Sequence, residues 1–186
     1  MQGLERLEYR GYDSAGVALV APGMDRVRVR KKAGRLSNLV ADIESDPLPE
    51  ATVAIGHTRW ATNGVPNDVN AHPHSSMDGR VAIIHNGIIE NASQLRLDLQ
   101  AEGYRFVSGT DTEVAAKLLG KIVDAVIAET GGPDLFEAVR RWAAMLEGAF
   151  DRSWRSTAAS RVSWSVRVMI RRSSSALGRV RTTWVR

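Results

Sequence analysis

The sequence predicts a layered domain in which helices stack on β-sheet, of the α/β or α+β class. Two observations predict this class. Short runs rich in Val, Ile and Ala have the length and composition of buried strands, and longer segments carry apolar residues at helical spacing. At 186 residues and 44% hydrophobic, the chain can also bury one core, so we expect one structured domain, over residues 1–150.

The first 60 residues predict the end of a helix, two strands, a second helix and a third strand, over residues 3–9, 14–21, 25–33, 35–45 and 51–58. The first helix is expected to end at Arg10-Gly11, because glycine suits the left-handed position that follows a helix. Val and Arg alternate in the second strand, as expected where only one face of a strand is buried.

The next 90 residues predict one buried strand and three helices, over residues 80–87, 91–104, 111–129 and 134–148. Asn91 is a good N-cap for the first of these helices, and Gly103 ends it. The other two helices begin with acidic residues, which the helix dipole favours at that end. No internal repeat is visible.

Composition limits the function classes. The chain contains no cysteine, which excludes a disulfide framework and a thiolate metal site. No apolar run approaches the length of a membrane span, and the N-terminus does not resemble a signal peptide, so we expect a cytoplasmic protein. Residues 1–150 hold 20 of the 21 acidic residues, whereas residues 151–186 hold 9 of the 25 Lys and Arg residues. The formal net charge of +4 therefore arises in the C-terminal segment.

The stretch HTRWATNG, residues 57–64, combines ligand-binding side chains at the end of a predicted strand. Arg59 can hold a carboxylate through two parallel hydrogen bonds, Thr62 and Asn63 can add neutral hydrogen bonds, and Trp60 offers a flat wall. A surface loop on which Arg59 and Trp60 merely pack is the alternative. The concentration of such groups at a strand end favours a binding site.

A second candidate follows the strand at residues 80–87. Asn86 offers a side-chain amide donor, and Gly87 lets its backbone N–H approach a ligand closely. Two donors directed at one point are what an oxyanion hole requires. Taken by itself, however, the Asn-Gly pair is more simply interpreted as an ordinary hairpin turn.

Asp111 lies at a predicted helix start, where we expect it to be the N-cap; binding of a ligand's ammonium group is the alternative. Arg10, Asp13 and Ser14 lie between a helix and a strand, where a capped turn is the simpler interpretation. The histidines, His57, His72, His74 and His85, are interpreted as structural, because Pro73 stiffens the HPH pair and no acidic partner lies at helical spacing. We therefore expect no metal and no cofactor.

Taken together and in order, four segments resemble the class II glutamine amidotransferase domain of the glutamine–fructose-6-phosphate aminotransferase (glucosamine-6-phosphate synthase) family. They are RLEYRGYDSAGVAL, GHTRWATNGVPNDVNAHPHS, IIHNGIIEN and GYRFVSGTDTEVAAKLL, and the resemblance runs from about Gln2 to Phe150. It implies a four-layer αββα sandwich of the N-terminal-nucleophile type. It also implies a glutaminase that passes ammonia to a synthase/isomerase domain acting on fructose 6-phosphate, in a homodimer without a nucleic-acid or membrane partner.

The resemblance also implies roles for individual residues. Arg59, Thr62 and Asp111 would hold the α-carboxylate and α-amino groups of L-glutamine. Asn86 and Gly87 would form the oxyanion hole. Further pocket roles fall to Trp60, at the exit for ammonia, and to Arg10 and Gly11, which would line the glutamine pocket.

Three departures from the family pattern bear on activity. The family's nucleophile is an N-terminal cysteine on a first strand, and we expect both to be missing here. Asn63 stands where the family pattern has His, which affects one glutamine contact. The C-terminal strands and the isomerase domains are also expected to be lost. The chain is therefore interpreted as an inactive fragment, and the alternative is a glutamine-binding or regulatory module.

Residues 151–186 are interpreted as a shifted reading frame. This segment contains 8 Ser, 9 Arg and 3 Trp but no Lys, a composition typical of a GC-rich gene translated out of frame. Neither strand nor helix periodicity persists in it, so we expect no regular structure there. A basic RNA-binding tail with stacking Trp side chains is the alternative.

Overall fold

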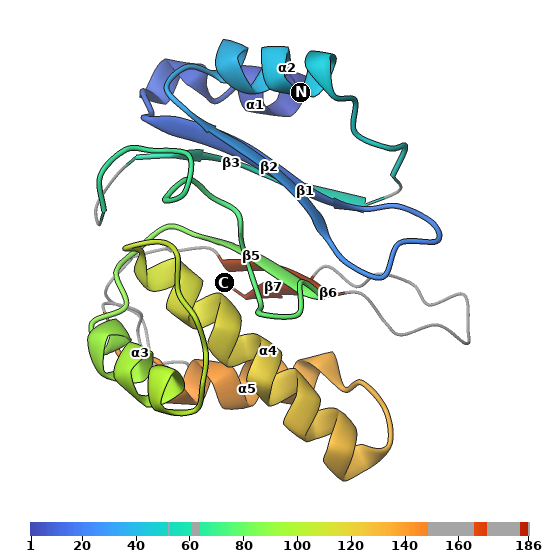
Figure 1. Cartoon of the computed structure of the whole chain (residues 1–186), viewed down its shortest axis with the longest axis vertical. Helices are drawn as coiled ribbons and strands as arrows, with labels where there is room; N and C mark the ends of the chain where they lie inside the picture. The colour runs from blue at the N-terminus through green and yellow to red at the C-terminus, as the bar shows by residue number, and fades with distance from the viewer. Residues whose placement is uncertain (52, 61–63, 149–165, 171–182, 186) are drawn as a thin grey trace, which may run out of the picture.

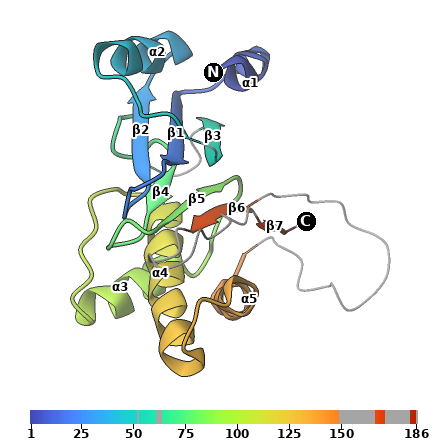
Figure 2. The same ribbon diagram turned by 90° about the vertical axis from the view of Figure 1, so that its right-hand side faces the viewer.

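The computed structural model describes residues 1–51, 53–60, 64–148, 166–170 and 183–185. They form four layers, which Figures 1 and 2 show in order: helices α1 and α2, a first sheet, a second sheet, and helices α3, α4 and α5. This arrangement confirms the α+β class and the αββα sandwich that the resemblance implies. The site is built where the two sheets and the second helical layer meet.

The first sheet has the order β2-β1-β3 and is antiparallel throughout. Its strands are β1 (Ser14–Val20), β2 (Arg28–Ala33) and β3 (Val53–Arg59). The short helix α1 (Gln2–Glu5) and helix α2 (Leu36–Ser45) cover its outer face. Leu4, Leu36 and Leu39 pack there against Ala15. The opposite face of β1, with Ala18 and Val20, points at the second sheet, because successive strand residues face opposite sides.

The second sheet has the order β4-β5-β6-β7. Its strands are β4 (His74–Ser75), β5 (Val81–His85), β6 (Val166–Ile170) and β7 (Thr183–Val185). Every residue of β5 is buried. Ala82 and Ile84 pack against the first sheet, whereas Val81 and Ile83 pack against the helices. Because both faces of β5 are buried, its sequence is a continuous apolar run instead of an alternation of apolar and polar residues.

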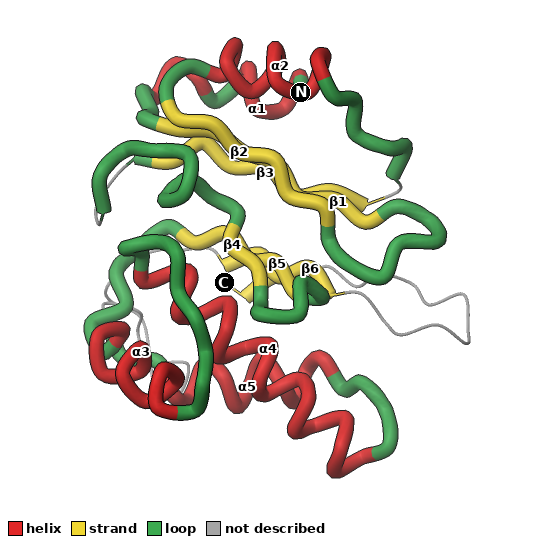
Figure 3. Tube along the Cα trace, viewed as in Figure 1, coloured by secondary structure: helices red, strands yellow, loops and turns green. Residues whose placement is uncertain are grey.

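The helical layer consists of α3 (Ala92–Ala101), α4 (Asp111–Thr130) and α5 (Leu135–Met145), as Figure 3 shows. Helix α4 lies against the second sheet and contacts both other helices. Trp142 is 2% exposed and donates its indole N–H to the carbonyl of Ala115 at 2.9 Å. In the described part of the chain, no helix has the length and apolar character needed to cross a membrane.

The expectation of no regular structure in residues 151–186 is wrong at two places. Val166–Ile170 pairs with β5, and Thr183–Val185 pairs with β6. The edge of β5 presents unpaired backbone groups, and the sequence VRVMI, with its β-branched residues, suits such an edge. The other residues of this segment lie outside the described residues, and the shifted reading frame and the boundary at residue 150 stay predictions.

Three local predictions differ from the structure in detail. The first helix is a short α1 followed by a 3-10 turn over Glu8–Arg10, and Gly11 follows with a φ of 71°. Asn91 holds the N-cap position of α3, but its side chain bonds to the backbone of Met145 and Glu147 instead of capping. The cap of α4 is Thr110, so the prediction of Asp111 as N-cap is wrong by one residue.

Thr110 offers a test of this local structure. Thr110 is 1% exposed, and its hydroxyl accepts from the backbone N–H of Glu113 at 3.2 Å and lies 3.0 Å from Nε2 of His74. Thr110→Val removes the hydroxyl and leaves these groups buried without a partner, so it should lower the free energy of unfolding by about 2 kcal/mol. Urea denaturation measures the loss. Thr110→Ser keeps the hydroxyl and should recover most of it, and equal losses in both variants would refute the capping role.

Candidate functional site

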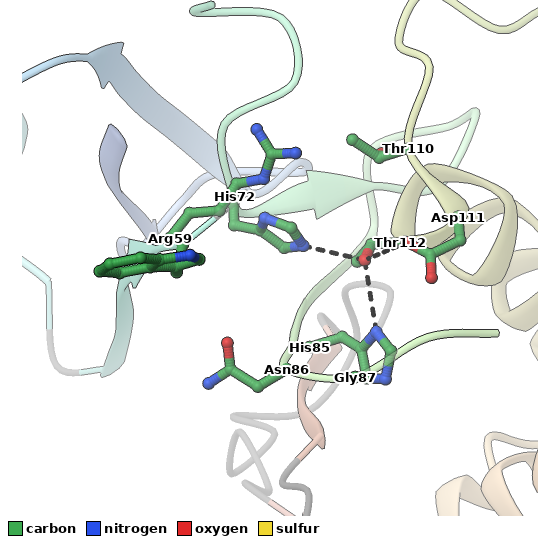
Figure 4. A pocket seen from close by; sticks show the side chains of 9 residues that line it. Arg59, His72, His85, Asn86, Gly87, Thr110, Asp111 and Thr112 are labelled. Carbon is green, nitrogen blue, oxygen red and sulfur yellow. Dashed lines mark hydrogen bonds between the residues drawn. The ribbon is translucent and has the colours of Figure 1, made fainter. Parts of the chain in front are cut away.

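A pocket of about 170 Å³ opens where β3 and β5 end, beside the N-terminus of α4 (Figure 4). Three separate segments of the chain and the loop before β4 therefore contribute to one site. The lining residues are Arg59, Trp60, His72, His85, Asn86, Gly87, Thr110, Asp111 and Thr112.

Arg59 reaches the pocket because of the strand period. Ile55 lies in the core between the sheets, so His57 and Arg59, two and four residues further along β3, share its face. Arg59 is 3% exposed. Its Nη1 lies 3.7 Å from Oδ1 of Asp13, and its Nη2 donates to the carbonyl of Gly64 at 3.3 Å. These contacts hold a positive charge at the pocket wall, where water screens it little.

Asn86 and Gly87 follow β5 directly and line the pocket. Gly87 has a φ of 148°, and a Cβ built on it would lie 2.9 Å from Nε2 of His85, so this turn requires glycine. Oδ1 of Asn86 lies 2.9 Å from Nε2 of His57 on the other sheet. The Asn-Gly pair thus ends a buried strand, and β5 pairs with β4 and β6 instead of forming a hairpin with the next segment.

The N-terminus of α4 supplies the acidic side of the pocket. Oδ2 of Asp111 accepts from the backbone N–H of Ile89 at 2.9 Å, which ties the turn after β5 to the helix. The hydroxyl of Thr112 lies 3.3 Å from Oδ1 of Asp111. The pocket therefore carries the Arg59 guanidinium and the Asp111 carboxylate in one small volume, a pattern suited to a ligand with both a carboxylate and an ammonium group.

The histidines belong to the site more than the sequence indicated. All four are buried, and His72 and His85 line the pocket. Nε2 of His72 lies 2.8 Å from the hydroxyl of Thr112, and Nδ1 of His85 lies 3.5 Å from the same oxygen. The rings of His57 and His72 are 4.8 Å apart, and those of His72 and His74 are 5.0 Å apart.

Burial keeps these rings neutral. Removal from water lowers the pKa of His57 to about 4 and that of His74 to about 3. Burial also lowers the pKa of His72 and of His85. Among the described residues, no three His, Asp or Glu side chains are arranged to hold a metal ion.

The loop that carries His72 packs very closely on the first sheet. A Cβ built on Gly16 of β1 would lie 2.1 Å from the carbonyl oxygen of His72, so only glycine admits this approach. Nζ of Lys31 donates to the carbonyls of Val69 and Ala71 at 2.9 and 2.7 Å and fixes the same loop. No sequence pattern indicated this packing, because Gly16 and His72 lie far apart along the chain.

Of the residues predicted from the sequence, the pocket brings together Arg59, Trp60, Asn86, Gly87 and Asp111. Gly11 is outside the lining and packs against the indole of Trp60, which is 69% exposed. Thr62, Asn63 and the side chain of Arg10 lie outside the described residues. Four further lining residues were not predicted from the sequence: His72, His85, Thr110 and Thr112.

Comparison with protein families supports the resemblance. Residues 17–137 match a family described as "Glutamine amidotransferase domain". Curated relatives named "Glutamine--fructose-6-phosphate aminotransferase [isomerizing]" are 55% identical in Corynebacterium efficiens and 49% identical in Thermus thermophilus, over 150 residues in each case. Each match covers 81% of this chain and 23% of the relative, so the chain spans about a quarter of these proteins.

Solved structures agree with the fold. The glutamine phosphoribosylpyrophosphate (PRPP) amidotransferase from B. subtilis, complexed with ADP and GMP, superposes with a TM-score of 0.62 and 26% identity. The match covers 90% of this chain and 31% of that one. A second structure, described as the allosteric regulatory enzyme of purine biosynthesis, has the same TM-score at 24% identity and supports the fold alone.

Proposed function

The chain belongs to the glutamine amidotransferase domain family, and on this premise we propose that its pocket binds L-glutamine as the glutaminase part of a glutamine–fructose-6-phosphate aminotransferase. The observation that carries the proposal is the convergence of a buried guanidinium, a carboxylate and an Asn-Gly pair in one small pocket. L-glutamine presents the three matching groups: an α-carboxylate, an α-ammonium and a side-chain amide.

In this proposal Arg59 binds the α-carboxylate through charge-assisted hydrogen bonds, and Asp111 binds the α-ammonium. Thr62 adds a hydrogen bond to the amino-acid end, Arg10 and Asn63 lie near the ligand, and Gly11 supports the indole of Trp60 from outside the lining. Support comes from the burial of Arg59, because a guanidinium out of water gains more from an anionic ligand than an exposed one.

Asn86 and Gly87 hold the side-chain amide oxygen in this proposal. When a nucleophile attacks the amide carbon, negative charge develops on that oxygen, and the Asn86 amide and the Gly87 N–H stabilise it. Both residues line the pocket next to Asp111. Trp60, exposed beside the pocket, borders the path by which ammonia leaves toward the domain that acts on fructose 6-phosphate.

The nucleophile in this family pattern is a cysteine, and the 186-residue chain contains none. We therefore expect this chain to bind L-glutamine without hydrolysing it. For the whole enzyme we propose transfer of nitrogen to fructose 6-phosphate, a fused synthase/isomerase domain, a homodimer and a cytoplasmic location. These are proposals for the whole enzyme because the chain spans 23% of its relatives.

The zero cysteine count also supports a second candidate, a non-catalytic glutamine-binding or regulatory module. A module of this kind would keep the contacts to the carboxylate and the ammonium group of glutamine. It would not need the path for ammonia past Trp60. One assay separates the two candidates. In a longer chain that contains the family's cysteine, the enzyme part releases ammonia, whereas a binding module does not.

Calorimetry of the 186-residue chain with L-glutamine tests the proposal. We expect saturable heat at one site, weaker binding of D-glutamine, and no release of ammonia during the titration. The D isomer is the control: when two substituents on its α-carbon exchange places, the ligand cannot contact Arg59, Asp111 and the Asn86-Gly87 pair at the same time. Absence of saturable heat from a chain that melts cooperatively would refute glutamine binding, and ammonia release would refute the cysteine requirement.

A further inference from the structure

His57 connects the first sheet to the candidate oxyanion hole on the second. It lies on β3, is 6% exposed, and does not line the pocket. Its Nε2 lies 2.9 Å from Oδ1 of Asn86, at the end of β5. The Asn86 side chain lines the pocket and is the only described group of the oxyanion pair that can rotate.

We propose that His57 is a positioning residue: its Nε2–H donates to Oδ1 of Asn86 and thereby turns the Asn86 amide N–H toward the pocket. The inference rests on the proposed function, because it assigns a role to the oxyanion hole. His57 acts through Asn86 and contacts no ligand itself.

The need for such a residue follows from the torsion of an Asn side chain. The terminal torsion of Asn is broad and roughly two-fold, so oxygen and nitrogen can exchange places at little cost. With its oxygen toward the pocket, Asn86 would repel the negative charge that develops on the amide oxygen of the ligand. A fixed donor on the far side of Asn86 removes this second orientation, which preorganises the site before the ligand arrives.

The surroundings of His57 favour the Nε2–H tautomer. A neutral imidazole carries one N–H, and burial lowers the pKa of His57 to about 4, so the ring is neutral near pH 7. Among the described residues, Nδ1 of His57 has no hydrogen-bond partner. A proton on Nδ1 would therefore be a buried donor without an acceptor, whereas a proton on Nε2 is 2.9 Å from the Asn86 oxygen.

The His57 ring packs against the ring of His72. Their ring centroids are 4.8 Å apart with planes inclined by 47°. His72 is fixed in turn by the 2.8 Å contact between its Nε2 and the hydroxyl of Thr112. A continuous series of contacts thus runs from Thr112, next to Asp111, through His72 and His57 to Asn86. The ammonium end and the amide end of the pocket are therefore held in a fixed relation.

Nitrogen NMR on the unaltered chain gives the first test. The 15N shifts of an imidazole separate its two neutral tautomers, and we expect Nε2 of His57 to be the protonated nitrogen near pH 7. The proton on Nε2 should also exchange slowly with water, because the ring is buried. A spectrum with the proton on Nδ1 would overturn the inference, whether or not glutamine binds.

Variants of His57 give the second test. His57→Leu removes the donor and should weaken L-glutamine binding about tenfold, whereas His57→Gln, which places an amide N–H near the position of Nε2, should restore most of the loss. L-norvaline, which has the α-groups of glutamine but no side-chain amide, should bind equally to the parent chain and to both variants. Equal weakening for L-glutamine and L-norvaline would show a merely structural role and overturn the inference.

A double-mutant cycle separates His57 from other buried histidines. In an Asn86→Ala background, His57→Leu should cause no further loss of L-glutamine affinity, because its effect passes through Asn86. His74→Gln is the matched control: His74 is equally buried but contacts Thr110 instead of Asn86, so the two losses should add. Additive losses for His57 and Asn86 would overturn the inference. If the parent chain binds no L-glutamine, the proposed function fails, and the tautomer alone decides the role of His57.

Discussion

Replacing Arg59 with Lys is expected to weaken L-glutamine binding by about 100-fold. Arg59 is 3% exposed and is held by Asp13 and the Gly64 carbonyl, so its planar guanidinium is set in place before the ligand binds. Lysine keeps the positive charge but loses the two-point geometry that fits a carboxylate, and a charge-assisted contact of this kind is worth about 3 kcal/mol. Calorimetry with L-glutamine measures the change.

A shortened ligand is the control for the Arg59 experiment. 4-Aminobutanamide keeps the amine and the amide of glutamine but lacks the α-carboxylate, so Arg59→Lys should leave its affinity unchanged. Melting temperatures of the two chains show whether both are folded. If the substitution weakens both ligands alike, Arg59 supports the loop around Gly64 instead of binding the carboxylate.

Acidification is expected to destabilise the folded chain strongly before the carboxylates titrate. His57 and His74 have an ordinary pKa of 6.5 and folded pKa values of about 4 and about 3, since burial disfavours the charged ring. Below about pH 6.5 the unfolded chain takes up protons that the folded chain does not, so the free energy of unfolding falls as the pH falls. By about pH 5 these two histidines together should cost about 4 kcal/mol.

Urea denaturation between about pH 7.5 and pH 5 measures this loss. His74→Gln cannot titrate in that window and should lose less stability on acidification than the parent chain, although it is less stable at neutral pH. Glu113, whose pKa is lowered to about 2 despite burial because Lys117 and Ser108 bond to it, adds a further loss only below about pH 4.5. A free energy of unfolding that stays constant from pH 7.5 to pH 5 would show that the histidines are accessible to water.

Much of the fold was predictable because it depends on local patterns. The apolar run at residues 80–87 predicted a buried strand, and β5 is buried on both faces, with Val81 and Ile83 on one side and Ala82 and Ile84 on the other. The helix predicted at residues 111–129 is α4, over Asp111–Thr130. The ends of the helices were predicted less exactly. Thr110 caps α4 in place of Asp111, because either side chain can accept a hydrogen bond from the helix N-terminus and the sequence does not distinguish them.

The C-terminal segment shows the limit of periodicity. Residues 151–186 lack a sustained pattern, yet Val166–Ile170 pairs with β5 over its whole length. Strand formation there depends on a partner edge distant in sequence, and β propensity is strongly dependent on context. The same limit applies to Asn91, whose side chain bonds to residues more than 50 positions away instead of to its own helix.

The sequence by itself determined the layered class, the order of the helices and of strands β1, β2, β3 and β5, and the residue types able to bind a carboxylate, an ammonium and an oxyanion. These properties follow from the chemistry of side chains and from short-range periodicity. Only the tertiary structure decided which of these groups share a pocket and that buried histidines join them. Arg59, Asn86 and Asp111 lie on β3, after β5 and on α4, and their meeting requires the two sheets to stack. The sheets stack because inner-face residues such as Ala18, Ile55 and Ile84 bury apolar surface together, and this burial places His57 against Asn86.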